Sequence, residues 1–108
     1  MNQELKERWI RALKSGAFKQ AQCSLINETG DAYCCLGVMG ILLGLGNNRL
    51  RTMRYSTPGT ERVNINDKLS MRILKRIGLT VKQQNTLADI NDYNEGFYAV
   101  IRYIEENI

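Results

Sequence analysis

The feature that most constrains the fold of this chain is an apolar run over residues 36–45, LGVMGILLGL. A helix that is apolar on every side is a helix that is buried all round. A helix that crosses a bilayer needs about twenty apolar residues, and this run has half that length. The run therefore predicts a central core helix and no membrane segment.

Three glycines, Gly37, Gly40 and Gly44, interrupt this run. Each glycine costs about 1 kcal/mol of helix stability relative to alanine, so we expect neighbouring groups to pack closely against these positions. Gly40 and Gly44 are four residues apart and would share one face of a helix. The pair predicts a tight crossing with another element of the core.

Two adjacent cysteines, Cys34 and Cys35, stand directly before the run, and Cys23 is the third cysteine of the chain. An odd number of cysteines without an export signal argues against a disulfide framework. Since the chain has no histidine, a four-ligand zinc site would need a carboxylate or a second chain. We expect buried structural thiols, with no metal and no cofactor. The alternative is a nucleophilic Cys35, activated by a helix N-terminus or by a nearby lysine or arginine.

The absence of histidine also narrows the function classes. It excludes Ser-His-Asp and Cys-His catalysis and removes the commonest general base near neutral pH. We therefore expect a protein that is not an enzyme and has no catalytic residues. Residues 1–16 carry charges throughout and contain no continuous apolar stretch, so we expect no secretory signal and a cytoplasmic protein.

Hydrophobic spacing predicts one compact domain over residues 1–108, of the α+β class and mainly helical. About five short helices are expected around the buried glycine-rich central helix, together with one small β-hairpin. The other helices are expected at residues 3–14, from Asn66 or Asp67 to Ile77, from Thr80 to Ile90, and at 97–107. The hairpin is expected to pair residues 18–26 with residues 31–34.

Local signals mark several boundaries between these elements. Gly78 followed by Leu79 predicts a Schellman end for the helix that stops at Ile77. Thr80 and Gln83 fit a capping box at the start of the next helix. Residues 91–96 are predicted to form a turn, and residues 49–65 an irregular loop with a short strand at 62–65.

The charge is distributed unevenly along the chain, whose net charge is +4. Residues 47–82 hold nine basic residues against two acidic ones, a balance of +7. Residues 83–108 hold one basic residue against five acidic ones, a balance of −4. The middle of the chain is therefore a candidate anion-binding segment.

Arginines in this segment supply forked donors for phosphate, and its hydroxyl and glycine residues supply further hydrogen bonds. Tyr55 is expected to stack on a base. The ligand-binding residues predicted from the sequence are Arg49, Arg51, Arg54, Tyr55, Ser56, Thr57, Gly59, Thr60 and Arg62. The expected partner is a phosphate-containing, nucleotide-like small molecule or an acidic host protein.

Two alternatives to this anion site follow from the same residues. The basic segment could be a solvated face, or it could pair with the acidic C-terminal helix of the same chain or of another subunit in a homo-oligomer. The two helices at 67–77 and 80–90 have the outline of a helix-turn-helix. The second of them offers Lys82, Gln83, Gln84 and Asn85 to base edges and then turns acidic at Asp89, which disfavours sequence-specific DNA binding.

Three groups of residues form a longer pattern: Trp9-x-x-Ala12-Leu13-x-Ser15-Gly16-x-Phe18-x-Gln20, Tyr33-Cys34-Cys35-Leu36-Gly37-Val38, and Leu87-x-x-x-Asn91-Asp92 with Ile104-Glu105. This pattern resembles that of a set of uncharacterised short phage and prophage proteins. The resemblance covers both ends of the chain and leaves residues 47–65 unmatched. The chain also lacks the serine that precedes the phenylalanine in the phage pattern, since Gly96 directly precedes Phe97.

The resemblance implies a small accessory protein that acts by binding in the cytoplasm of a host cell. Such a protein would be a counter-defence factor that sequesters a nucleotide signal or blocks a host defence protein in a stoichiometric complex. The alternative functions are those of a DNA-binding regulator and of a thiol enzyme. A DNA-binding regulator would bind duplex DNA, and its affinity would fall steeply as the salt concentration rises. A thiol enzyme would lose its turnover when Cys35 is replaced.

Overall fold

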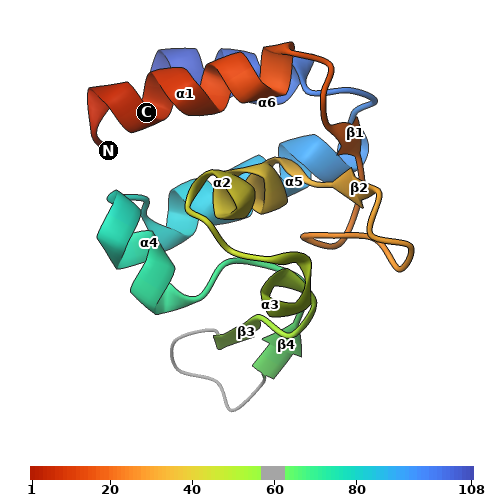
Figure 1. The fold of residues 1–108 in the computed structure, drawn as a ribbon. Helices are drawn as coiled ribbons and strands as arrows, with labels where there is room; N and C mark the ends of the chain where they lie inside the picture. Colours follow the sequence, from red (N-terminus) through yellow and green to blue (C-terminus); the bar gives the residue numbers. More distant parts are fainter. Residues whose placement is uncertain (57–62) are drawn as a thin grey trace.

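The computed structural model describes residues 1–56 and 63–108 and confirms a mainly helical α+β fold (Figure 1). The described residues form six helices: α1 (Gln3–Lys14), α2 (Cys35–Leu42), α3 (Asn47–Arg51), α4 (Met71–Ile77), α5 (Val81–Tyr93) and α6 (Tyr98–Asn107). They also form two two-stranded sheets, from β1 (Lys19–Gln20) with β2 (Ala32–Tyr33) and from β3 (Arg54–Ser56) with β4 (Val63–Ile65).

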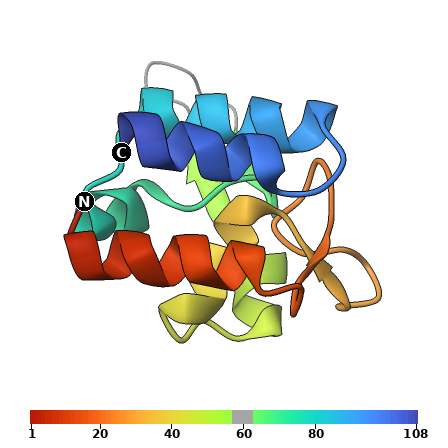
Figure 2. The ribbon, with the colours of Figure 1, turned by 90° about the horizontal axis from the view of Figure 1, so that it is seen from above.

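Four of the helices enclose the main core. Helix α1 contacts α2 and α6, and α5 contacts the same two helices, so the four close a ring. Helices α1 and α6 lie side by side in one layer, and the N-terminus of the chain, before α1, lies near the C-terminus, after α6 (Figure 2). Helix α3 and the β3–β4 hairpin lie on the opposite side of α2 and α5 (Figure 1). Helix α3 and the hairpin are thus separated from α1 and α6 by the core.

Helix α1 confirms the prediction for residues 3–14. Asn2 caps it by accepting a hydrogen bond from the Leu5 amide at 3.1 Å. Trp9 and Leu13 are buried, and the Trp9 indole Nε1 donates to the Cys35 carbonyl at 3.0 Å. This bond joins α1 to the start of α2 inside the core.

Helix α2 begins where the cysteines predict but ends at Leu42, three residues before the end of the apolar run. Gly44 has φ +85°, which no helical residue adopts, so the predicted crossing on Gly40 and Gly44 is wrong. The close approaches occur at Gly37 and Gly40 instead. A Cβ at Gly37 would collide with the Leu25 carbonyl, and one at Gly40 would lie 2.7 Å from Leu50 Cδ2.

The predicted hairpin between residues 18–26 and 31–34 is also wrong. Strands β1 and β2 are parallel, with Lys19 beside Ala32, and only the isolated bridge from Ile26 to Tyr33 is antiparallel. The reason is a reversal at Cys23, whose φ is +64° and which therefore stops β1 from running straight into a turn at residues 27–30. In the described residues the antiparallel pair is β3–β4: β4 confirms the short strand predicted near residues 62–65, whereas β3 lies in the segment predicted to be irregular.

The start of α4 differs from the prediction of a cap at Asn66 or Asp67. Ser70 is the N-cap, and its Oγ accepts from the Ile73 amide at 3.4 Å. Asn66 has φ +61° and donates its backbone N–H to the Met53 carbonyl, so it belongs to the end of the hairpin. The chain needs these extra residues to bring Leu69 into the core before the helix starts.

The junction of α4 and α5 confirms the local signals. Gly78 is left-handed, and the Leu79 amide donates to the Leu74 carbonyl at 3.0 Å, as in a Schellman end. Thr80 and Gln83 form the predicted capping box. Helix α5 extends to Tyr93, three residues further than predicted, so Asn91 lies in a buried helical turn and not in a loop.

Candidate functional site

The predicted ligand-binding residues fall on two elements and a stretch that lies outside the described residues. Arg49 and Arg51 belong to α3, and Arg54, Tyr55 and Ser56 form β3. Arg49, Arg54 and Ser56 are exposed, whereas Arg51 is half-buried. The other four predicted residues, Thr57, Gly59, Thr60 and Arg62, lie outside the described part of the chain.

Tyr55 is a core residue, which contradicts its predicted role in stacking on a base. Only 2% of it is exposed, because β3 alternates and turns its middle side chain inward. Lys68 Nζ lies 5.6 Å from the centre of its ring, a cation–π distance. The tyrosine therefore anchors the hairpin and is not available to a ligand.

Arg51 packs between α3 and the turn that precedes β2. Its guanidinium lies against Gly30, where an added Cβ would be 2.5 Å from Arg51 Nη2. Beside it, the Tyr33 hydroxyl donates to Asn47 Oδ1 at 2.8 Å. These contacts hold α3 against the turn before β2, so Arg51 is less free than Arg49 or Arg54 to meet a partner.

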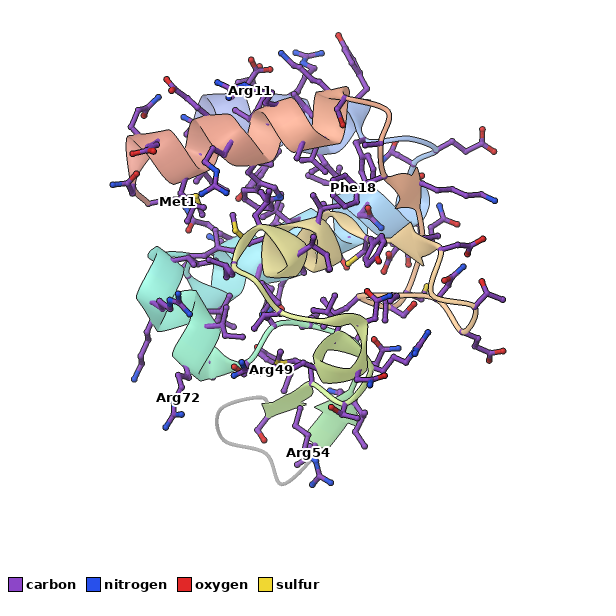
Figure 3. All side chains as sticks on the ribbon, viewed as in Figure 1. Met1, Arg11, Phe18, Arg49, Arg54 and Arg72 are labelled. Carbon is purple, nitrogen blue, oxygen red and sulfur yellow. The ribbon has the colours of Figure 1, made fainter. Side chains whose placement is uncertain are left out.

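The exposed cations of residues 47–56 and 63–82 are together called the basic surface. Figure 3 shows Arg49, Arg54 and Arg72 on the side of the molecule opposite α1 and α6. None of these cations forms an ion pair with an acidic residue of the described ranges. The basic surface consists of Arg49, Arg54, Arg72, Lys75, Arg76 and Lys82.

Pairing of this surface with the acidic C-terminal helix of the same chain does not occur among the described residues. Glu105 of α6 lies 3.9 Å from Lys14 Nζ of α1, and Glu106 lies 3.4 Å from Arg102 Nη2. The core separates α6 from α3 and the hairpin (Figure 1). Within residues 1–56 and 63–108, no ion pair neutralises the positive charge of the basic surface.

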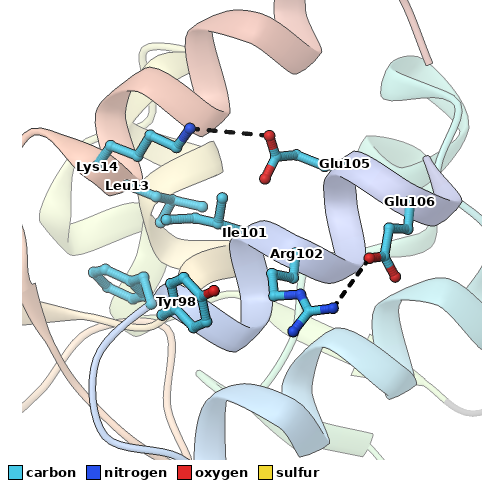
Figure 4. A pocket seen from close by; sticks show the side chains of 8 residues that line it. Leu13, Lys14, Tyr98, Ile101, Arg102, Glu105 and Glu106 are labelled. Carbon is cyan, nitrogen blue, oxygen red and sulfur yellow. Dashed lines mark hydrogen bonds and ion pairs between the residues drawn. The ribbon is translucent and has the colours of Figure 1, made fainter.

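A hollow of about 450 Å³ between α1 and α6 is a second surface feature, and sequence reasoning missed it (Figure 4). The available signal in the sequence was Tyr98, an aromatic residue outside the buried positions of α6, and the structure leaves it 73% exposed. The charged groups on the rim form the two ion pairs just described, so little charge is left for a ligand. The hollow is lined by Leu13, Lys14, Phe97, Tyr98, Ile101, Arg102, Glu105 and Glu106.

The amide side chains of α5 that the sequence offers to DNA bases are bonded within the chain or buried, and only Lys82 among the four candidates is exposed. Gln83 Oε1 accepts from the Thr80 amide in the capping box. Gln84 is fully buried and exchanges hydrogen bonds with the backbone of Leu69 at 3.0 and 3.1 Å. Asn85 Oδ1 is buried as well, without a hydrogen-bond partner among the described residues. The helix therefore lacks the free amide side chains that base recognition requires.

The two adjacent thiols lie in the core at the start of α2. Cys34 is the N-cap, and its Sγ accepts from the Gly37 amide at 3.4 Å. Burial raises the pKa of Cys34 to about 12 and also raises the pKa of Cys35 well above its ordinary value of 9.0. Neither thiol is poised to act as a thiolate near neutral pH. The expectation of a buried thiol is wrong for Cys23, which is exposed, and the charge of Asp92 raises its pKa.

These positions predict a clear order of thiol reactivity. At pH 8, Ellman's reagent should react with one thiol of the folded chain, Cys23, and with all three after unfolding in urea. Replacing Asp92 with asparagine should speed the reaction of Cys23, since it removes the charge that raises its pKa. Rapid reaction of a second thiol in the folded protein would contradict the burial of Cys34 and Cys35.

Residues of the phage-like pattern meet in a buried hydrogen-bond network. Asn91 is fully buried; its Nδ2 donates to the Ala21 carbonyl at 2.9 Å, and its Oδ1 accepts from the Cys35 amide at 3.2 Å. Gln20 Nε2 donates to the Asn91 carbonyl at 3.0 Å. Asp92 Oδ1 accepts from the Cys23 amide at 2.8 Å. The network ties the loop after β1 to α2 and α5, so these residues hold the fold together.

Residues 1–56 and 63–108 contain neither a metal-binding cluster nor a membrane-spanning helix. No cluster of three or more cysteine, aspartate or glutamate side chains there could hold a metal ion. None of the helices in those ranges is long and apolar enough to span a bilayer.

Comparison with known proteins gives one partial match. The family model of a domain of unknown function, DUF8296, matches residues 1–51. No curated protein matches the chain, and no solved structure does. The matched part includes α1, the β1–β2 sheet, α2 and α3, and it stops before the β3–β4 hairpin.

Proposed function

We propose that this chain is a non-catalytic binding protein that engages an extended anionic partner in a stoichiometric complex. The observation that carries the proposal is the basic surface, whose exposed cations have no acidic partner among the described residues. Exposed arginine and lysine side chains without an acidic partner attract anionic surfaces and increase the rate at which an anionic partner associates with the protein. The sequence resemblance supplies the context, a phage-type counter-defence factor that acts on a host component in the cytoplasm.

An extended partner fits these residues better than an enclosed nucleotide does. Arg49 and Arg54 are exposed on different elements, α3 and β3. Tyr55, the residue expected to stack on a base, is held in the core. Small-molecule sites are concave and bury most of their ligand, whereas exposed cations on several elements suit a partner that spans them.

Fluorescence anisotropy with a labelled polyglutamate peptide and a labelled ATP analogue tests the proposal. The peptide should bind at low salt with one molecule per chain, and more tightly than the ATP analogue. Its affinity should fall about tenfold or more between roughly 50 and 200 mM salt, because exposed charges are screened. Absence of peptide binding at low salt would contradict the proposal, and tight binding of the ATP analogue would favour the enclosed nucleotide.

A further inference from the structure

We infer that the partner of the basic surface is a protein segment that mixes acidic with apolar side chains, and that it docks on the outer face of the β3–β4 hairpin. This inference rests on the proposed function and names its partner class. The outer face consists of Arg54, Ser56, Val63 and Ile65.

The pairing of the two strands builds this face. Residues directly opposite each other in an antiparallel pair project to the same side. Arg54 is opposite Ile65, and Ser56 is opposite Val63. Tyr55 faces the core, so the four flanking residues face away from it. The hairpin therefore presents one guanidinium and two aliphatic side chains together.

The exposure of the aliphatic side chains favours a protein over a nucleic acid. Val63 is 48% exposed and Ile65 is 59% exposed. The other large hydrophobic residues exposed in the described ranges are tyrosines, Tyr93 and Tyr98, which carry a polar hydroxyl. A phosphate backbone offers nothing to an aliphatic side chain, whereas the centre of a protein interface is apolar.

The backbone of the hairpin is consistent with the same partner class. In the described residues β3 and β4 form a sheet of two strands, so each strand has an edge that pairs with no other strand. Such an edge presents N–H and C=O groups to an extended peptide. A protein segment can pair with these groups as an added strand while its side chains contact the outer face, and a nucleic acid has no backbone that pairs in this way.

The charges select an acidic segment and disfavour a second copy of this chain. Arg54 forms no ion pair with an acidic residue of the described ranges, and the same basic surface holds Arg49. Two outer faces would bring like charges together. The acidic helix of a second copy is a poor counterpart, because Glu105 and Glu106 already pair with Lys14 and Arg102.

Two peptides of equal length and charge test the inference, one of Glu-Glu-Leu repeats and one of Glu-Glu-Ser repeats. The wild-type chain should bind the leucine peptide about tenfold more tightly, as expected when modest apolar area is buried. The variant Val63→Thr/Ile65→Thr keeps β-branched side chains and the net charge, and it should lose that preference. Tyr93→Gln, which removes an exposed aromatic ring from α5, should keep it.

The variant Arg49→Glu/Arg54→Glu separates this inference from the proposed function. If it weakens both peptides while the wild type shows no preference for leucine, the basic surface binds but the inference is wrong. If it weakens neither peptide, the proposed function fails as well. Tighter binding of duplex DNA than of the leucine peptide, unchanged in Val63→Thr/Ile65→Thr, would assign the surface to nucleic acid. A dimer in sedimentation that dissociates in Val63→Thr/Ile65→Thr would assign the face to self-association.

Discussion

Replacing Gly37 with alanine is expected to lower the free energy of unfolding by about 3 kcal/mol, or to prevent folding. The new Cβ would collide with the backbone carbonyl of Leu25, which cannot rotate away as a side chain can. That carbonyl also accepts the Cys34 amide at 3.2 Å, so moving it would break a bond at the start of α2. The gain in helix propensity, about 1 kcal/mol, is too small to compensate.

Gly40→Ala is the matched control because it adds the same methyl group to the same helix. Its obstacle is the end of the Leu50 side chain, which can change rotamer, although Leu50 is itself buried. Urea denaturation should show a loss at least 1.5 kcal/mol smaller than that of Gly37→Ala, on the order expected for overpacking against a flexible group. Equal losses in the two variants would contradict a specific backbone contact at Gly37.

Asn91→Leu is expected to destabilise the fold by about 3 kcal/mol, since leucine leaves two buried groups without a partner. These groups are the Ala21 carbonyl and the Cys35 amide, which bond to the two ends of the Asn91 amide. Asn91 is fully buried, so water cannot replace either bond without opening the core. The free energy of unfolding in urea measures this loss directly.

Asn94→Ala provides the comparison for Asn91→Leu. Asn94 is exposed three residues further on, and its side chain makes one bond, to the Ile90 carbonyl at 2.8 Å. This variant should change stability by about 0.5 kcal/mol or less, as is usual for surface positions. A loss below about 1 kcal/mol for Asn91→Leu would show that the network contributes little and is not what holds α2 to α5.

Elements with local signals could be predicted from the sequence. Helix α1 has an apolar stripe and a capping asparagine, and Thr80 with Gln83 specifies the start of α5. The fold class followed from several such segments together. The burial of Cys34 and Cys35 followed from their position beside the apolar run. Each of these features depends on residues within a few positions of one another.

Features that depend on distant contacts could not be predicted. Strands β1 and β2 are parallel because Cys23 turns the chain, and cysteine is not a residue that signals a left-handed turn. Spacing alone could not tell that α2 ends before Gly44. The burial of Tyr55 could not be predicted either, because β3 has three residues and its alternation is too short a pattern to show which side faces the core.

The residues of the pattern that resembles phage proteins have structural roles in the fold. Trp9, Gln20, Cys35 and Asn91 are joined by hydrogen bonds within the fold. These contacts describe how the chain folds rather than what it binds. The basic surface lies outside the pattern, on α3, the hairpin, α4 and the start of α5, which is where we place the binding function.

The affinity of the polyglutamate peptide for two charge-matched variants tests the binding role of the basic surface most directly. Each Arg→Glu replacement changes the charge by −2, so Arg49→Glu/Arg54→Glu and Arg8→Glu/Arg11→Glu both bring the net charge from +4 to 0. All four arginines are exposed, and the second pair lies on α1. We predict a loss of about tenfold or more for the first variant and a much smaller one for the second. Equal losses would show that net charge alone attracts the peptide and would contradict a binding role for the basic surface.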